Sequence, residues 1–294
     1  MKNELSIEKF ALTCDITRRN GKALYNSDIT ITVALPPNYN LGKKNYPVCY
    51  VLDGSKALSK EDDSSGIQKL YSQQLCSAPE VIYVGIDAPD KEAVRTSAYG
   101  APYNTTLFLS NTARSERFYL EGAGDYFLDW IANVVKPETD RRYRTLAEAD
   151  YCGIIGFSSG GTLALLGGIL RPDIFTRVGA FSPSTWAWSN WFYGALANAG
   201  RHYDYLDETG DRRIYTPQPG CISRMFIYQG GKDGSAGNDS WAAGDVRNIY
   251  DLLIESGAGH NGREFAFNAE GIHSYSAWQK HISACLNVLF PDFI

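Results

Sequence analysis

Residues 151–170 read YCGIIGFSSGGTLALLGGIL, and this stretch decides how the rest of the chain is interpreted. It opens with a short apolar run, Tyr151–Ile155, passes through the pentapeptide Gly156–Gly160, and continues as an apolar segment of helical length. The pentapeptide GFSSG matches G-x-S-x-G, a pattern that places a serine on a sharp turn between a strand and a helix. Glycines at the flanking positions allow the turn to close, so Ser158 is a candidate nucleophile.

A tight Gly/Ser-rich turn without chemistry is the alternative interpretation of the same five residues. The context favours the first, because the pattern directly follows an expected strand and directly precedes an expected helix. A serine hydroxyl becomes an effective nucleophile only when a positioned base removes its proton. The hypothesis therefore requires a histidine and an acid elsewhere in the chain.

Apolar runs rich in β-branched residues alternate with segments of helical period over most of the chain. We expect strands at residues 28–35, 47–52, 81–86, 151–155, 177–181, 225–228 and 264–267. We expect amphipathic helices at residues 125–135, 159–170, 245–255 and 274–289. Four of the expected strands are uninterrupted apolar runs, which is typical of strands covered on both faces. This alternation predicts an α/β fold with a mostly parallel central sheet and helices on both faces.

Composition excludes several classes of protein. With 294 residues, 44% of them hydrophobic, and a net charge of −5, the chain is too apolar for a disordered protein. The acidic balance argues against nucleic-acid binding, which needs a basic patch. No stretch approaches the ~18 apolar residues of a membrane span, and the N-terminus lacks a signal-peptide pattern. We expect one cytoplasmic domain over residues 1–294 that binds neither nucleic acid nor membrane.

The six cysteines are scattered singly, without a C-x2-C pair, and we expect them to be free thiols: Cys14, Cys49, Cys76, Cys152, Cys221 and Cys285. No His/Cys cluster has metal-ligand spacing. The phosphate-loop, zinc-protease and dinucleotide patterns are also missing from the sequence. We therefore expect neither a metal nor a cofactor.

One region interrupts the strand–helix alternation. Between residues 182 and 223 no such unit is recognisable, yet aromatic residues are concentrated from Phe181 to Tyr205. A long irregular insert is usually functional, and we expect an insert or cap over residues 182–223. We expect three of its side chains to line a substrate pocket: Trp186, Trp188 and Trp191. The alternative is that these bulky side chains only pack a surface flap.

Only four histidines are available as the base: His202, His260, His273 and His281. His202 lies in the aromatic-rich region, and His281 lies within the last expected helix. His260 precedes the last expected strand at its amino end, which is the wrong edge of the sheet. His273 follows that strand and precedes the last helix, so it is the histidine placed at the carboxyl edge.

The acid is expected in the loop after the strand at 225–228. Asp233 comes first in this loop and is flanked by glycines, so we expect it to orient His273. Asp239 is the reserve, and its alternative role is to cap the helix that begins near Trp241.

An oxyanion hole needs two backbone N–H groups aimed at the developing negative charge. One would come from Ser159, the residue after the candidate nucleophile. The other would come from the loop after the strand at 47–52, where Gly54 lets the backbone approach closely. We expect Ser55 or Gly54 as this second donor.

Seven phrases carry a resemblance to a known family. They are VALPPNY (33–39), YPVCYVLDG (46–54), VGID (84–87), KPETDRRYRT (136–145), GFSSGGTLAL (156–165), RPDIFTRVGAFSPSTW (171–186) and GIHSYSAW (271–278). In this order they resemble the putative-esterase family of the α/β-hydrolases, which holds enterochelin esterases, feruloyl esterases, S-formylglutathione hydrolases and mycolyltransferases. The resemblance runs from about Ser27 to the C-terminus, and LDG and SPSTW are most similar to the enterochelin esterase-like subgroup.

The resemblance implies an α/β-hydrolase fold with Ser158 as the nucleophile and His273 as the base. It also implies an acid at Asp233, although this position varies within the siderophore subgroup. Arg95, which follows the VGID phrase, is a candidate substrate-binding residue by the same resemblance.

We therefore expect a serine hydrolase that cleaves a small-molecule carboxylic ester, of siderophore or aromatic type, through an acyl-enzyme. The alternatives are an acyltransferase or a peptidase with the same triad, and a non-catalytic binding protein on a hydrolase scaffold. Acyl transfer to sugars is disfavoured, because the mycolyltransferases are secreted and we expect this chain to be cytoplasmic. The natural substrate and the oligomeric state stay open.

Overall fold

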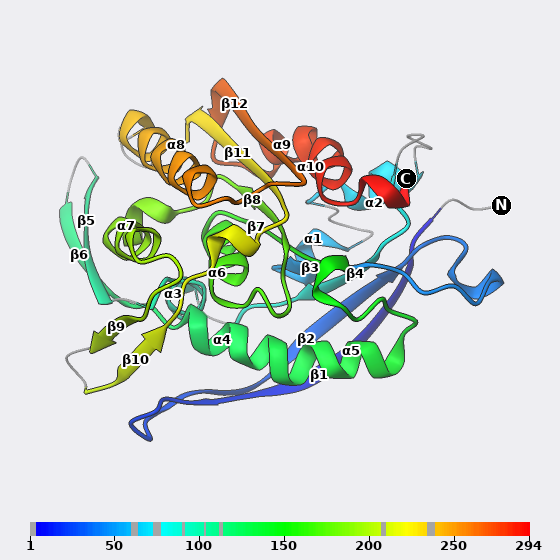
Figure 1. Ribbon diagram of the computed structural model, residues 1–294, viewed down its shortest axis with the longest axis horizontal. Coiled ribbons are helices and arrows are strands. Elements are labelled where there is room, and N and C mark those ends of the chain that lie inside the picture. Colours follow the sequence, from blue (N-terminus) through cyan, green and yellow to red (C-terminus); the bar gives the residue numbers. More distant parts are fainter. Residues whose placement is uncertain are drawn as a thin grey trace.

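The computed structural model describes residues 4–59, 64–72, 78–89, 92–102, 104–111, 114–206, 210–233 and 239–294 (Figure 1). Within these ranges, eight strands form a central sheet in the order β1-β2-β4-β3-β7-β8-β11-β12. These strands are β1 (Ser6–Thr17), β2 (Ala23–Leu35), β3 (Val48–Leu52), β4 (Ile82–Ile86), β7 (Cys152–Phe157), β8 (Arg177–Phe181), β11 (Arg224–Lys232) and β12 (Gly262–Ile272). β2 pairs antiparallel with β1 and β4, and the other neighbours pair in parallel.

Helices cover both faces of this sheet. The helices in the described part of the chain are α1 (Gly54–Ala57), α2 (Ile67–Ser72), α3 (Glu92–Ala98), α4 (Gly124–Trp130), α5 (Lys136–Arg142), α6 (Ser159–Leu170), α7 (Ser189–Ala197), α8 (Asp239–Glu255), α9 (Tyr275–Trp278) and α10 (Ile282–Leu289). Short 3-10 turns are η1 (Tyr39–Leu41), η3 (Ala149–Tyr151), η4 (Thr185–Trp188), η5 (Pro219–Cys221), η6 (Gln279–His281) and η7 (Pro291–Phe293). The mostly parallel sheet with helices around it confirms the predicted α/β-hydrolase fold.

Two hydrophobic cores lie on the two faces of the sheet. One contains residues of α4, α6, α7 and α8, and the other contains residues of α1, α2, α9 and α10. Residues of β3 alternate between them: Val48, Tyr50 and Leu52 pack in the first core, and Cys49 and Val51 in the second. All residues of β3, β4 and β7 are buried, and so are Met225–Tyr228 of β11, which confirms that the uninterrupted apolar runs are strands covered on both faces.

The helix α6 differs from the amphipathic helix that we expected. Eleven of its 12 residues are buried, because it contacts β7 and β8 as well as α4 and η5. A helix covered on all sides needs no polar stripe, so its apolar sequence reflects burial rather than amphipathicity.

The helix expected at residues 125–135 continues to Arg142 through a π-helical turn. After α4, residues Ile131–Val135 (η2) form the π-helical turn, and α5 follows directly. Pro137 has no N–H to donate to the carbonyl of Asn133, so the regular hydrogen-bond pattern cannot be kept there.

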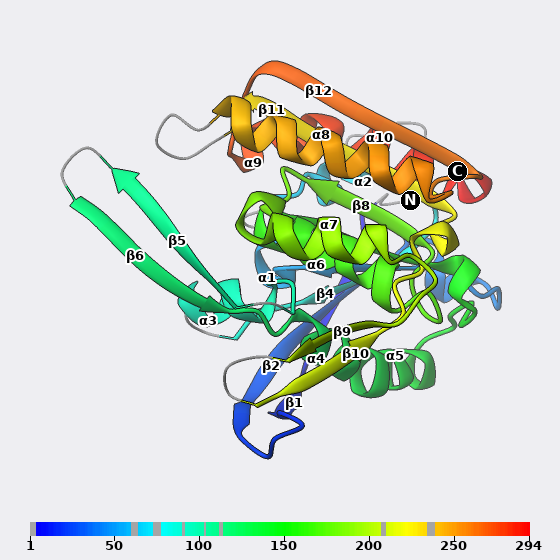
Figure 2. The same cartoon turned by 60° about the vertical axis from the view of Figure 1, so that its left-hand side comes forward.

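Sequence patterning missed two features of the sheet architecture. Most residues of β1 are exposed or half-buried, so charged residues interrupt its apolar signal. The strands β5 (Asn104–Asn111) and β6 (Arg114–Glu121) form a separate antiparallel hairpin. Figure 2 shows this hairpin extending away from the rest of the chain.

The segment 182–223 also holds more regular structure than we expected. It contains η4, α7 and the antiparallel hairpin of β9 (Tyr203–Leu206) and β10 (Arg212–Tyr215). The Trp191 ring packs edge-on to the rings of Tyr203 and Tyr215, with centroids 6.4 and 6.3 Å away. The aromatic residues therefore pack the hairpin onto α7.

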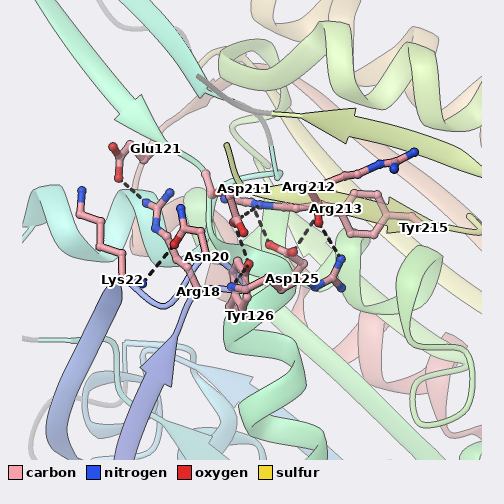
Figure 3. A network of polar contacts seen from close by, with 12 residues as sticks. Arg18, Asn20, Lys22, Glu121, Asp125, Tyr126, Asp211, Arg212, Arg213 and Tyr215 are labelled. Atoms are coloured by element: carbon pink, nitrogen blue, oxygen red, sulfur yellow. Dashed lines mark hydrogen bonds and ion pairs between the residues drawn. The ribbon is translucent and has the colours of Figure 1, made fainter. Parts of the chain in front are cut away.

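A buried network of charges ties β10 to the start of α4 (Figure 3). The Arg213 side chain is fully buried. Its Nη1 donates to the Gly122 carbonyl at 2.6 Å and to Asp125 Oδ1 at 3.1 Å, and its Nε donates to Asp211 Oδ2 at 3.1 Å. The Tyr126 hydroxyl donates to Asp211 Oδ2, and the Tyr215 hydroxyl donates to Asp125 Oδ2.

We expect Arg213→Met to destabilise the protein by about 3–5 kcal/mol, because it leaves the carboxylates of Asp125 and Asp211 buried without their cation. The matched control is Arg212→Met at the next position, whose side chain is 64% exposed and pairs with Asp204 at the surface. The control is expected to unfold close to the wild type. Urea unfolding of both variants measures the difference, and equal midpoints would contradict the assignment.

The destabilisation should also depend on pH. Burial raises the pKa of Asp125, and the charge of Arg213 partly offsets this effect. Without the guanidinium, folded Asp125 keeps its proton to higher pH than unfolded Asp125 does, so the folded state binds more protons. The stability of Arg213→Met therefore falls as the pH rises above about 4, the ordinary pKa of an aspartate. Thermal midpoints across this range measure the slope, and a slope equal to that of Arg212→Met argues against the role of Asp125.

Candidate active site

The sharp turn between β7 and α6 places Ser158 at the carboxyl edge of the sheet. Ser158 has φ 57° and ψ −125°, a conformation that is rare for a residue with a side chain. Its N–H donates to the Phe181 carbonyl of β8 at 2.9 Å. A Cβ on Gly156 would lie 2.2 Å from the carbonyl oxygen of Gly160. Only glycine therefore fits at the first flanking position.

His273 and Asp233 form a chain of hydrogen bonds with Ser158. His273 Nε2 lies 2.8 Å from Ser158 Oγ, and His273 Nδ1 lies 2.7 Å from Asp233 Oδ1. Ser158 follows β7, Asp233 follows β11, and His273 follows β12, so three strand ends supply the three groups. The structure thus brings together the three residues that the sequence nominated.

The Asp233 carboxylate is buried and held by its own strand. Its side chain is 1% exposed, while that of His273 is 40% exposed. Asp233 Oδ2 accepts a hydrogen bond from Gln229 Nε2 at 3.0 Å and one from the Gly230 N–H at 3.4 Å. Asp239, the reserve, is the first residue of α8, and its side chain lies outside the described part of the chain.

The other histidines lie away from Ser158. His202 Nδ1 lies 3.2 Å from the Thr216 hydroxyl, and His260 lies in the turn before β12. The His281 ring stacks on Tyr228 with centroids 4.4 Å apart. Burial lowers the pKa of His281, and the nearby Glu264 charge partly offsets this.

One of the two expected oxyanion donors is engaged elsewhere. Ser159 is the first residue of α6, so its N–H has no acceptor within the helix. Ser55, however, donates its N–H to Asp87 Oδ1 at 2.6 Å, and its hydroxyl donates to the same carboxylate. The expectation for Ser55 is therefore wrong in this structure, because Asp87 after β4 takes its N–H. Gly54, which begins α1, remains the alternative donor.

Arg95 forms a bidentate ion pair with Asp53 near the turn that carries Ser158. Its Nε lies 2.7 Å from Asp53 Oδ1, and its Nη2 lies 2.6 Å from Asp53 Oδ2. Burial alone would lower the pKa of Arg95, but the hydrogen bonds and charge of Asp53 outweigh it and raise the pKa. A Cβ on Gly160 would lie 3.5 Å from Asp53 Oδ2, so the pair lies against the start of α6.

The three tryptophans of the aromatic segment do not share one environment. Trp188 and Trp191 are 1% and 0% exposed and belong to the core. The expectation that they line a substrate pocket is corrected, because their rings fill the space beside Gly100 and against the β9–β10 hairpin. Trp186 is only partly buried and remains a candidate.

Three residues beside the candidate triad were not predicted from the sequence: Ser182, Ser184 and Trp278. Ser184 Oγ lies 3.4 Å from Ser158 Oγ. Ser182 has φ 44°, and its Oγ accepts a hydrogen bond from Trp278 Nε1 at 2.8 Å. Both serines lie in the SPSTW phrase, and Trp278 ends the GIHSYSAW phrase. The family resemblance therefore pointed to these residues, but no residue pattern indicated what they contact.

Across the described residues, no group of three His, Cys, Asp or Glu side chains is arranged to hold a metal ion. The five described cysteines are free thiols, and Cys76 lies outside the described residues. Of the helices in the described part of the chain, none is long and apolar enough to cross a membrane.

Solved structures with a similar fold include a serine hydrolase and a ferulic acid esterase. An IroE-like serine hydrolase from Shewanella oneidensis superimposes with a TM-score of 0.66 at 19% identity, over 97% of this chain and 81% of that one. A ferulic acid esterase superimposes with a TM-score of 0.64 at 16% identity, over 99% of this chain and all of that one.

Comparison of sequences finds an esterase among the relatives of this chain. A siderophore triacetylfusarinine C esterase of Aspergillus fumigatus is 28% identical over 145 residues, which are 49% of this chain and 46% of that protein. The chain spans about half the length of the curated relatives it matches. The family described as "Putative esterase" matches residues 22–288, which is nearly the whole chain. The protein therefore belongs to the "Putative esterase" family.

Proposed function

We propose that the protein is a serine hydrolase that cleaves carboxylic esters through an acyl-enzyme. The hydrogen-bonded chain Asp233–His273–Ser158 carries this proposal. Membership of the "Putative esterase" family supports the same reaction.

The hydrogen bonds suggest the tautomer that the reaction needs. Because the Asp233 carboxylate accepts, Nδ1 of neutral His273 carries the proton and Nε2 is free to accept from the Ser158 hydroxyl. As Ser158 Oγ attacks the ester carbonyl, Nε2 takes its proton, and Asp233 stabilises the imidazolium that forms. The imidazolium then protonates the leaving alcohol, and a water activated by Nε2 releases the acid.

The negative charge on the tetrahedral intermediate needs donors near Ser158. We assign the Ser159 N–H as the first, because it begins α6 and has no acceptor within that helix. We assign the Gly54 N–H as the second, because the Ser55 N–H is held by Asp87.

A fluorophosphonate probe tests the nucleophile directly. The wild-type protein should form a covalent adduct on Ser158, and Ser158→Ala should form none. Ser256→Ala, a serine-to-alanine change at the end of α8, is the matched control and should label like the wild type. Intact-protein mass spectrometry reads both, and equal labelling of Ser158→Ala would refute the proposal.

Substitution of the base and the acid tests the rest of the chain of hydrogen bonds. We expect His273→Ala and Asp233→Asn to lower kcat for p-nitrophenyl acetate by about 10²–10⁴-fold. His260→Ala, at an exposed turn before β12, should leave kcat unchanged. If Asp239→Asn lost activity and Asp233→Asn kept it, the assignment of the acid would be overturned.

For the substrate we propose a siderophore-type or aromatic ester. The names of the siderophore esterase relative and of the ferulic acid esterase neighbour support this class, and the partly buried Trp186 supplies an aromatic side chain in the segment after β8.

A panel of substrates tests this class. We expect siderophore or feruloyl esters to be hydrolysed with a kcat/KM at least about 10-fold above that of short acyl esters, because remote binding energy contributes to the transition state. Trp186→Ala should reduce this preference rather than the turnover of p-nitrophenyl acetate. Equal kcat/KM values across the panel would contradict the assignment, and transfer of the acyl group to an alcohol in preference to water would point to an acyltransferase.

A further inference from the structure

Trp278, on α9, contacts the imidazole of His273. The two ring centroids are 5.0 Å apart, and the ring planes are nearly perpendicular at 85°. Trp278 is 3% exposed, so its position is set by the packing around it. Nothing in the proposed chemistry so far uses this contact.

Three further contacts hold the indole in place. Its Nε1 donates to Ser182 Oγ at 2.8 Å. Its ring stacks on Phe157, with centroids 5.5 Å apart at 28°, and meets Tyr275 edge-on at 5.0 Å. Phe157 directly precedes Ser158. The indole therefore contacts both the proposed base and the strand that ends at the proposed nucleophile.

The Ser182 end of this arrangement links to the acid. Ser182 lies at the turn after β8 with φ 44°, a backbone conformation that is costly for a serine. Its N–H donates to the Tyr228 carbonyl at 2.8 Å, and Tyr228 lies on β11, the strand that leads to Asp233. Trp278 therefore contacts His273 and Phe157 directly and is linked through Ser182 to the strand that leads to Asp233.

The imidazole needs such a restraint. Hydrogen bonds at Nδ1 and Nε2 hold the ring at two points, and the ring can still tilt about the line that joins them. The His273 side chain is 40% exposed, so solvent offers no resistance on its open side. Such a tilt leaves Nε2 in place but turns its lone pair away from Ser158 Oγ, and proton transfer depends on this alignment.

We propose that Trp278 is a positioning residue for His273: its indole, fixed by Ser182 and Phe157, sets the tilt of the imidazole and thereby the alignment of Nε2 with Ser158 Oγ. This inference rests on the proposed function, since it assigns the residue that orients the base. In this role Trp278 acts only through His273.

Kinetics of Trp278 variants test the proposal. Trp278→Leu should lower kcat by about 10- to 100-fold while KM changes by less than about 3-fold, because alignment rather than binding is lost. Trp278→Phe, which keeps an aromatic ring, should give a kcat between those of Trp278→Leu and the wild type. It also keeps the proposal falsifiable if the leucine variant does not fold.

Trp130→Leu is the matched control. Trp130 is also buried, at 5% exposed, donates its Nε1 to the Thr13 carbonyl at 3.0 Å, and packs on Phe127. It lies at the end of α4, away from His273. This variant should lose thermal stability and keep kcat. If it lowered kcat as much as Trp278→Leu does, the effect would be general destabilisation and the proposal would fall.

Proton NMR gives a readout that needs no substrate. The Nδ1 proton of His273, bonded to a carboxylate, should give a far-downfield signal that Asp233→Asn removes. Trp278→Leu should broaden or shift this signal, and Trp130→Leu should not. An unchanged signal and an unchanged kcat in Trp278→Leu would overturn the proposal. Inactivity of the wild-type protein with the NMR response intact would instead count against the esterase function alone.

Discussion

The turn at Ser158 is the constraint on which the rest of the structure depends. The chain must pass from a buried strand into a buried helix within one residue, and it does so with Ser158 at φ 57°. The turn closes because Gly156 approaches the Gly160 carbonyl too closely for any side chain. The strain at this one residue is offset by β7 and α6, whose apolar side chains pack between the sheet and its covering helices.

The groups around this turn are held from several directions at once. Gln229 donates a hydrogen bond to the Asp233 carboxylate, this carboxylate is hydrogen-bonded to His273 Nδ1, and Trp278 packs edge-on with the imidazole. Gln229 lies in β11 and Asp233 directly follows it, whereas His273 follows β12 and Trp278 ends α9, and all four lie at the same edge of the sheet. This convergence is what the parallel α/β fold offers, because the carboxyl ends of its strands meet along one edge.

The fold and the three hydrogen-bonded residues could be predicted because their signals are local and ordered along the chain. Uninterrupted apolar runs predicted β3, β4, β7 and β11, and the strand ends selected one histidine of four. The Ser55 prediction failed because its N–H is taken by Asp87, 32 residues away, which no local pattern shows. The prediction that Trp188 and Trp191 line a substrate pocket failed because a local excess of aromatic residues does not show whether their side chains are buried.

We propose that Asp233 and His273 act on Ser158 as one unit. Groups that act as a unit lose activity non-additively, so a double-mutant cycle tests the claim most directly. We predict that the double variant His273→Ala/Asp233→Asn has the same kcat as His273→Ala, because Asp233 acts only through the imidazole. If the two losses multiplied instead, Asp233 would act independently of His273 and the account would be contradicted.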